Sequence, residues 1–142
     1  ALQALSLALE WVTRGDVTLG LAWLGRARRL LADLPPSVPH GYLRYADASF
    51  EMDVYGEPGP AFEAAQELDA LARDHGDPTL VGLARVLDGL AAVRSGRTAE
   101  GFGALDEAMI DVVGGRVSPL WAGDIYCTVV HLSHQLGDWG RM

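Results

Sequence analysis

The sequence predicts an all-α protein built as a right-handed superhelical stack of antiparallel helix hairpins, with a repeat period of about 40 residues. Three observations predict it. Gly15, Gly56, Gly96 and Gly137 recur 41, 40 and 41 residues apart, each in a short polar turn between apolar runs. Small residues keep a constant register around these glycines. No stretch combines two-residue alternation with enrichment in β-branched residues, so we expect no strands.

The register is tested at the positions seven residues before, five after and twelve after each turn glycine. Eight of the ten residues there are Gly, Ala or Ser: Ala8, Ser49, Gly89, Val130, Gly20, Ala61, Gly101, Ala27, Leu68 and Ala108. Small side chains at such places allow the two helices of a hairpin to pack closely. The small residues therefore support the repeat period independently of the glycine spacing.

Apolar periodicity and turn residues predict the individual helices. We expect them at 1–13, 17–33, about 40–55, about 60–74, 78 to about 94, about 98–113 and about 119–136, with an eighth beginning at Trp139. Pro35 and Pro36 end the second helix because proline cannot continue it.

Two helices are predicted to begin with a capping residue followed by proline. Asp77 precedes Pro78 and Ser118 precedes Pro119, which fits an N-cap with proline in the first turn. Thr98 is expected to cap the sixth helix. The short connections between helices predict antiparallel neighbours.

Length and composition indicate one domain, residues 1–142, with repeats at about 1–37, 38–77, 78–117 and a partial one at 118–142. We expect it to be a piece of a longer protein. The net charge is −8 and all 11 basic residues are Arg, which argues against a nucleic-acid surface on this segment. The lone Cys127 excludes an internal disulfide and fits a reducing compartment. Neither a signal peptide nor an apolar run of the ~18 residues that a membrane span needs is present.

The small-residue pattern resembles the tetratricopeptide repeat. The first repeat matches at Ala8, Gly15, Gly20 and Ala27, and the third at Gly89, Gly96, Gly101 and Ala108. The second matches more loosely, at Ser49, Gly56, Ala61 and Leu68. The longer period places the additional residues in the linkers between repeats. The resemblance implies a cytoplasmic scaffold that binds proteins or peptides.

A second likeness covers residues 97–138, which are similar to helical-repeat regions of LuxR-type transcriptional regulators of bacteria. In those proteins the array lies between an ATPase-like module and a C-terminal helix-turn-helix. Neither module occurs in this sequence, so the family's ATP and DNA sites map onto no residue of it. The resemblance implies a role in transcription regulation.

In arrays of this kind the inner wall is built from the first helix of each hairpin. The residues predicted for it are Leu2, Leu5, Leu9, Val12, Thr13, Leu43, Ala46, Phe50, Asp53, Val54, Leu83, Val86, Leu90, Val93, Arg94, Asp124, Cys127, His131, His134 and Gln135. This wall changes from apolar to polar along the chain. It is either a site for an amphipathic helix or an extended peptide, or a surface covered by other helices or by closure of the superhelix.

We expect the centre of a partner site at Phe50, Val54, Leu90 and Arg94, where apolar anchors lie beside one charge that can orient a carboxylate. The partner-binding face extends over Asp53, His131 and His134.

Cys127, His131 and His134 share a helical face with Asp124 one turn earlier, and these residue types bind zinc. Four ligands along one straight helix extend over about 15 Å, too far to meet one ion, so we predict no metal site.

The sequence has no Lys for a phosphate-binding loop and no nucleophile elbow, so we predict no enzyme and no cofactor. The function expected is a protein- or peptide-binding or sensing scaffold in a bacterial regulatory protein. Two alternatives stay open: self-association or the spacing of flanking domains, and a small-molecule pocket at the Asp124–His134 end.

Overall fold

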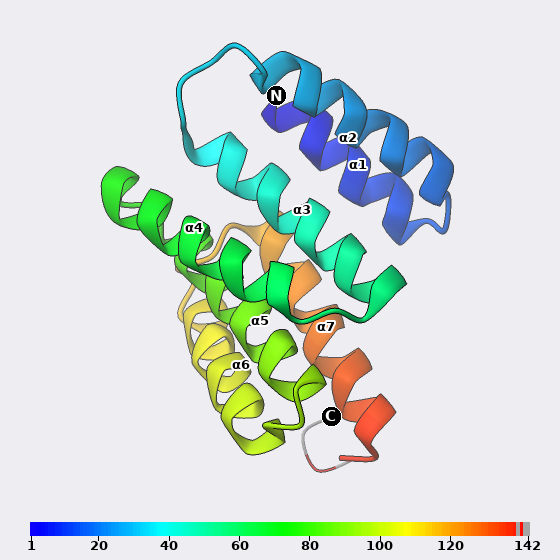
Figure 1. Ribbon diagram of the computed structural model, residues 1–142, viewed down its shortest axis with the longest axis vertical. Coiled ribbons are helices and arrows are strands. Elements are labelled where there is room, and N and C mark those ends of the chain that lie inside the picture. Colours follow the sequence, from blue (N-terminus) through cyan, green and yellow to red (C-terminus); the bar gives the residue numbers. More distant parts are fainter. Residues whose placement is uncertain (139, 141–142) are drawn as a thin grey trace.

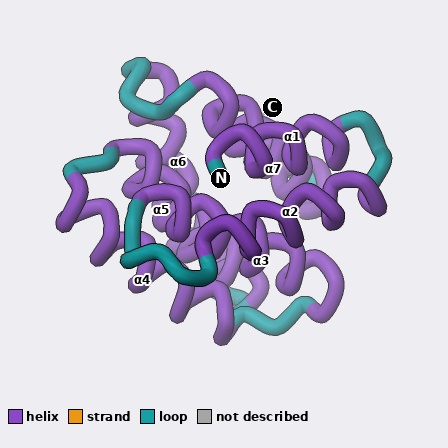
Figure 2. Tube along the Cα trace, turned by 90° about the horizontal axis from the view of Figure 1, so that it is seen from above, coloured by secondary structure: helices purple, strands orange, loops and turns teal. Residues whose placement is uncertain are grey.

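A computed structural model gives the structure of the protein and describes residues 1–138 and 140. Within them the chain forms helices and connecting loops and no strand (Figure 2). The seven helices are α1 (Leu2–Thr13), α2 (Val17–Leu31), α3 (Val38–Tyr55), α4 (Gly59–His75), α5 (Pro78–Arg94), α6 (Thr98–Val113) and α7 (Pro119–Leu136). The all-α prediction is confirmed. The eighth helix expected from Trp139 lies outside the described residues.

Successive helices pack against one another, and α5 contacts α3, α4, α6 and α7. In Figure 1 the α1–α2 hairpin lies at one end of the molecule, and α6 with the C-terminal half of α7 lies at the other. One cluster of buried side chains runs from Ala4 in α1 to Leu132 in α7. The described helices therefore share a core.

The four repeat glycines all adopt the left-handed conformation that the turns require, with φ of 85° at Gly15, 72° at Gly56, 82° at Gly96 and 70° at Gly137. Three of these turns close with the same backbone bond, from an amide to a carbonyl five residues earlier. It joins Asp16 to Trp11, Arg97 to Ala92 and Asp138 to Ser133, each at 2.9 Å. The predicted turns after α1, α5 and α7 are thus structurally equivalent.

The helix starts follow the predicted caps only in part. Asp77 accepts a hydrogen bond from the Leu80 amide at 3.0 Å, as expected of an N-cap. Ser118 occupies the cap position of α7 without a side-chain cap bond. The cap of α6 is Arg97, and Thr98, predicted as the cap, is the first residue of the helix. The second helix ends at Leu31, two residues before the predicted end.

The small residues produce close helix packing in the first and third hairpins. A Cβ added to Gly101 would lie 2.5 Å from the Gly89 carbonyl oxygen, so α5 and α6 meet backbone to backbone. A Cβ on Gly20 would lie 3.2 Å from the Ala8 carbonyl oxygen. Both contacts fall at the predicted register positions.

The second hairpin departs from that register by one residue. Ala48 and Met52 are each 1% exposed, while Ser49, the predicted contact, is only half-buried. Arg44, one turn before Ala48, reaches α4 through Glu67 at 2.8 Å. Gly56 is followed by Glu57 and Pro58 before α4 begins, whereas one residue follows the glycine in the turns after α1 and α5. The buried residues of α3 lie one position earlier than the register predicts.

Candidate functional site

Long side chains of α3 and α7 meet near the middle of the predicted inner wall. The Tyr45 hydroxyl donates to Asp124 Oδ2 at 2.6 Å. The Trp121 ring lies edge-on to Tyr45, with centroids 5.7 Å apart, and tilted against Tyr42 at 5.1 Å. These side chains join α3 and α7, which are each the first helix of a predicted hairpin and are not consecutive in the chain. One predicted wall residue, Asp124, is therefore engaged by Tyr45, which was not assigned to the wall.

The polar pair in this contact is shielded from water. Burial raises the pKa of the Asp124 carboxyl, the hydrogen bond from Tyr45 opposes that rise, and the negative charge of Asp53 adds to it. Burial, with the charge of Asp124, raises the pKa of Tyr45 well above its usual value. Asp124 was predicted for the polar end of an open wall. The structure places it in an interhelical contact instead.

An open groove lies between α2 and α3. We call it the α2–α3 groove; its lining is Leu21, Leu24, Arg28, Asp47, Phe50, Glu51 and Tyr55. Phe50 is 38% exposed and Leu21 41% exposed, so both offer apolar surface to a partner. Of the predicted centre, Phe50 is the residue that lines it.

The α2–α3 groove has both paired and unpaired charged side chains. Arg28 Nη2 lies 2.6 Å from Asp47 Oδ1, so this pair satisfies itself across the two helices. Glu51 is exposed and has no hydrogen-bond or ion-pair partner among the described residues. The groove therefore combines an apolar floor with one uncompensated carboxylate.

The other residues predicted for the centre lie elsewhere. Val54 is 52% exposed and Asp53 is exposed, both near the end of α3. Leu90 is half-buried against the core, and Arg94 is the exposed last residue of α5. Neither Leu90 nor Arg94 lines the α2–α3 groove. The structure thus separates Phe50 from the charge that was expected beside it.

The contribution of α2 to the groove was missed from the sequence, because the inner wall was assigned to first helices alone. Leu21, Leu24 and Arg28 follow one another at spacings of three and four residues, which places them on one face of a helix. Leu21 is exposed on that face while Leu24 is buried beneath it. This spacing is the sequence signal that could have indicated the contribution of α2 to the groove.

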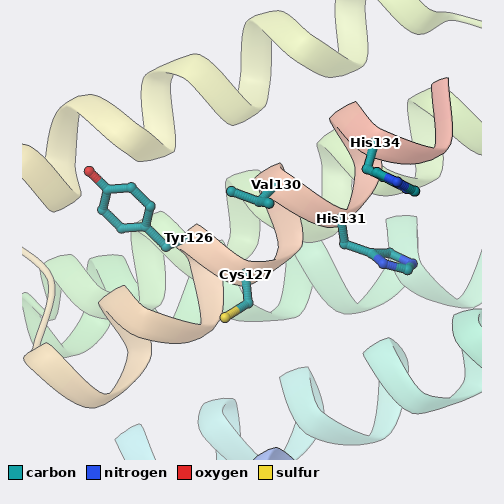
Figure 3. Close-up of a pocket in the computed structure, with 5 residues that line it drawn as sticks. All are labelled: Tyr126, Cys127, Val130, His131 and His134. Carbon is teal, nitrogen blue, oxygen red and sulfur yellow. The ribbon is translucent and has the colours of Figure 1, made fainter. Parts of the chain in front are cut away.

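His131 and His134 line a second, shallow hollow along the exposed side of α7 (Figure 3). The remaining residues around it are Tyr126, Cys127 and Val130, all from the same helix. The side-chain amide of Gln135 lies 2.8 Å from a ring nitrogen of His131. Across residues 1–138 and 140, no group of three or more His, Cys, Asp or Glu is arranged to hold a metal ion.

Comparison with known proteins finds no matching family, no similar curated protein and no similar solved structure. None of the described helices has the length and apolar character needed to cross a membrane. The geometry of the described residues therefore carries the functional argument.

Proposed function

We propose that this protein is a non-enzymatic interaction module that binds an amphipathic helix of a partner protein in the α2–α3 groove. The observation that carries the proposal is the exposed Phe50 beside Leu21 and the unpaired Glu51. The right-handed superhelical stack, the tetratricopeptide and LuxR-type relationship, and a cytoplasmic role in bacterial regulation belong to the same proposal. They rest on the sequence pattern.

The chemistry of the groove defines the helix that it would accept. Apolar side chains of the partner would cover Phe50 and Leu21, which removes apolar surface from water. A Lys or Arg next to them would pair with Glu51. The protein's net charge of −8 would speed the approach of such a basic segment. An acidic helix would be rejected by the same charges.

The test is fluorescence anisotropy with two labelled synthetic helical peptides. Both carry Leu and Phe on one face, and they differ only in having Lys or Glu beside that face. The Lys peptide should bind and the Glu peptide should not. Phe50→Ala should weaken binding about tenfold, which corresponds to a loss of about 1.4 kcal/mol for an aromatic anchor. Ile110→Ala, on the exposed side of α6, should leave binding unchanged.

Two variants with the same change in net charge distinguish an ion pair between Glu51 and the peptide from a general attraction of the acidic protein for a basic peptide. Glu51→Lys and the control Glu107→Lys alter the net charge by the same amount, and both residues are exposed. Glu51→Lys should weaken binding of the Lys peptide more than Glu107→Lys does. Equal effects of the two variants, or full binding by Phe50→Ala, would refute the groove assignment. Circular dichroism confirms that each variant is folded.

A further inference from the structure

The ion pair that crosses the α2–α3 groove leaves hydrogen-bond donors unused. Arg28 Nη2 lies 2.6 Å from Asp47 Oδ1, and the guanidinium forms no other hydrogen bond in the described part of the chain. A guanidinium has five N–H donors in one plane and can bind a carboxylate through two of them at once. The Arg28 side chain is 58% exposed, so a carboxylate of a partner can reach it. Arg28 is therefore still able to bind a carboxylate, although Asp47 balances its charge.

Asp47 also determines where the guanidinium lies. Arg28 belongs to α2 and Asp47 to α3, and both line the groove, so their hydrogen bond holds the cation between the two helices. Arg29, the next residue of α2, is exposed, does not line the groove and forms no ion pair with any described residue. A side chain that is already held in place loses less conformational freedom on binding than a free one. Asp47 is thus a positioning residue for Arg28.

The groups along the groove follow a fixed order. Asp47, Glu51 and Tyr55 are four residues apart, so they lie on one face of α3 at steps of about 6 Å. Arg28 lies beside Asp47, at one end of this row, and Tyr55 is at the other end. The order along the groove is therefore a held cation, an unpaired carboxylate and an exposed aromatic ring. A helix lying along the groove meets these groups in the same order.

We propose that Arg28 binds an acidic side chain of the partner helix and thereby sets the direction in which that helix lies. This inference rests on the proposed function, in which a Lys or Arg of the partner pairs with Glu51. The acidic residue lies about one turn from that basic residue, because Asp47, which holds Arg28, is one turn from Glu51. Charges of alternating sign then run from Asp47 through Arg28, the partner's acid and the partner's base to Glu51. A helix with acids alone is still rejected, because it brings no cation to Glu51.

A double-mutant cycle between protein and peptide measures the contact. The Lys peptide of the proposed function is made with either Glu or Gln four residues before its Lys, and fluorescence anisotropy gives the ratio of the two affinities. This ratio should be about threefold higher for the wild type than for Arg28→Gln, the range of an exposed ion pair. Arg29→Gln makes the same change in net charge outside the groove and should keep the wild-type ratio. The gain in peptide helicity from a Glu–Lys pair is common to all three proteins and cancels.

Disulfide trapping determines the direction of the bound peptide with Arg28 intact. Tyr55→Cys in a Cys127→Ser background places one thiol at the end of the groove away from Arg28. A peptide with Glu four residues before Lys puts its Glu at Arg28 and its C-terminus toward position 55. A Cys at the C-terminus of this peptide should therefore cross-link, and a Cys at its N-terminus should not. When Glu and Lys are exchanged, the N-terminal Cys should cross-link instead.

The outcomes distinguish this inference from the proposed function. If the Gln version of the peptide does not bind the wild type, or binds Phe50→Ala equally well, the proposed function fails and the inference fails with it. If that version binds and requires Phe50, the inference alone is overturned by equal affinity ratios for Arg28→Gln and Arg29→Gln. It is equally overturned if both orders of Glu and Lys cross-link through the same end of the peptide. Circular dichroism confirms that each variant is folded.

Discussion

The helices α1 and α5 have the same position in the repeat but different surroundings. Ala8 and Gly89 precede their turn glycines by the same seven residues. Nevertheless α1 buries three residues, Ala4, Leu5 and Ala8, whereas eleven of the 17 residues of α5 are buried. The sequence of α1 is the less charged of the two, with Glu10 as its one ionisable side chain.

The difference comes from the number of neighbours. In the described structure α5 packs against four helices, and α1 packs against α2 and α3. The position of a repeat helix in the array therefore determines how many of its residues are buried, and its amino-acid composition does not. The same comparison predicts how substitutions of similarly buried or similarly packed residues in the two regions will differ in cost.

The largest difference is expected for truncation of a core leucine. Leu87 of α5 is 0% exposed and Leu5 of α1 is 2% exposed, so the two are equally buried. Leu87→Ala should lower the free energy of unfolding by about 4 kcal/mol, and Leu5→Ala by about 2, because the site in α1 has fewer helices around it and collapses more easily. Urea unfolding followed by circular dichroism measures both. Equal losses would show that burial alone decides the cost.

A smaller difference is expected where the hairpin helices cross. Alanine at Gly101 would meet the Gly89 carbonyl at 2.5 Å and the Val93 amide at 2.9 Å, both of them backbone atoms. Alanine at Gly20 would chiefly meet Val12 Cγ2 at 2.4 Å, the end of a side chain that is 42% exposed. Alanine itself favours a helix by about 1 kcal/mol over glycine.

We therefore expect Gly101→Ala to destabilise the protein by about 2 kcal/mol, since the two backbones must separate. Gly20→Ala should be within about 1 kcal/mol of the wild type, because Val12 can move and the helix preference compensates. The two melting temperatures provide the measurement. A loss at Gly20 as large as that at Gly101 would mean that the first hairpin is packed as rigidly as the third.

The repeat itself could be predicted from the sequence because its signals are local. A glycine with positive φ and a proline after a capping aspartate impose geometry on the residues next to them. These signals placed the helices within a few residues of their observed bounds. The small residues at fixed distances from the turn glycines also located the close crossings at Gly20 and Gly101.

The features that the sequence did not reveal depend on residues far apart in the chain. The hydrogen bond from Tyr45 to Asp124 spans 79 residues, and neither side chain carries a local sign of its partner. The α2–α3 groove depends on how the first hairpin docks on the second, because Phe50 of α3 lines it together with Leu21 and Leu24 of α2. The one-residue shift in the second hairpin accompanies one additional residue between Gly56 and α4, and a constant spacing could not predict it.

The smallest of the predicted effects on stability concerns the contact between α3 and α7, which is polar, whereas the helix crossings within the hairpins are apolar. Burial raises the pKa of Asp124 in the folded protein, so the folded state holds this proton more tightly than the unfolded state does. The stability that this group contributes is present at acid pH and is lost as the pH rises through its folded pKa. Asparagine does not titrate, and its amide oxygen can still accept the hydrogen bond from Tyr45.

The free energy of unfolding of Asp124→Asn, relative to the wild type, should therefore rise with pH from about 4, the usual aspartate pKa, toward neutrality. Urea unfolding at a series of pH values measures the difference. Asp74→Asn removes the same charge from an exposed position of α4 and serves as the control. A difference that stays flat or falls with pH would mean that the Tyr45 hydrogen bond outweighs burial, and that α3 and α7 are joined by an ionised carboxylate. A rise would show that this contact, unlike the apolar crossings of the hairpins, loses strength as the solution becomes neutral.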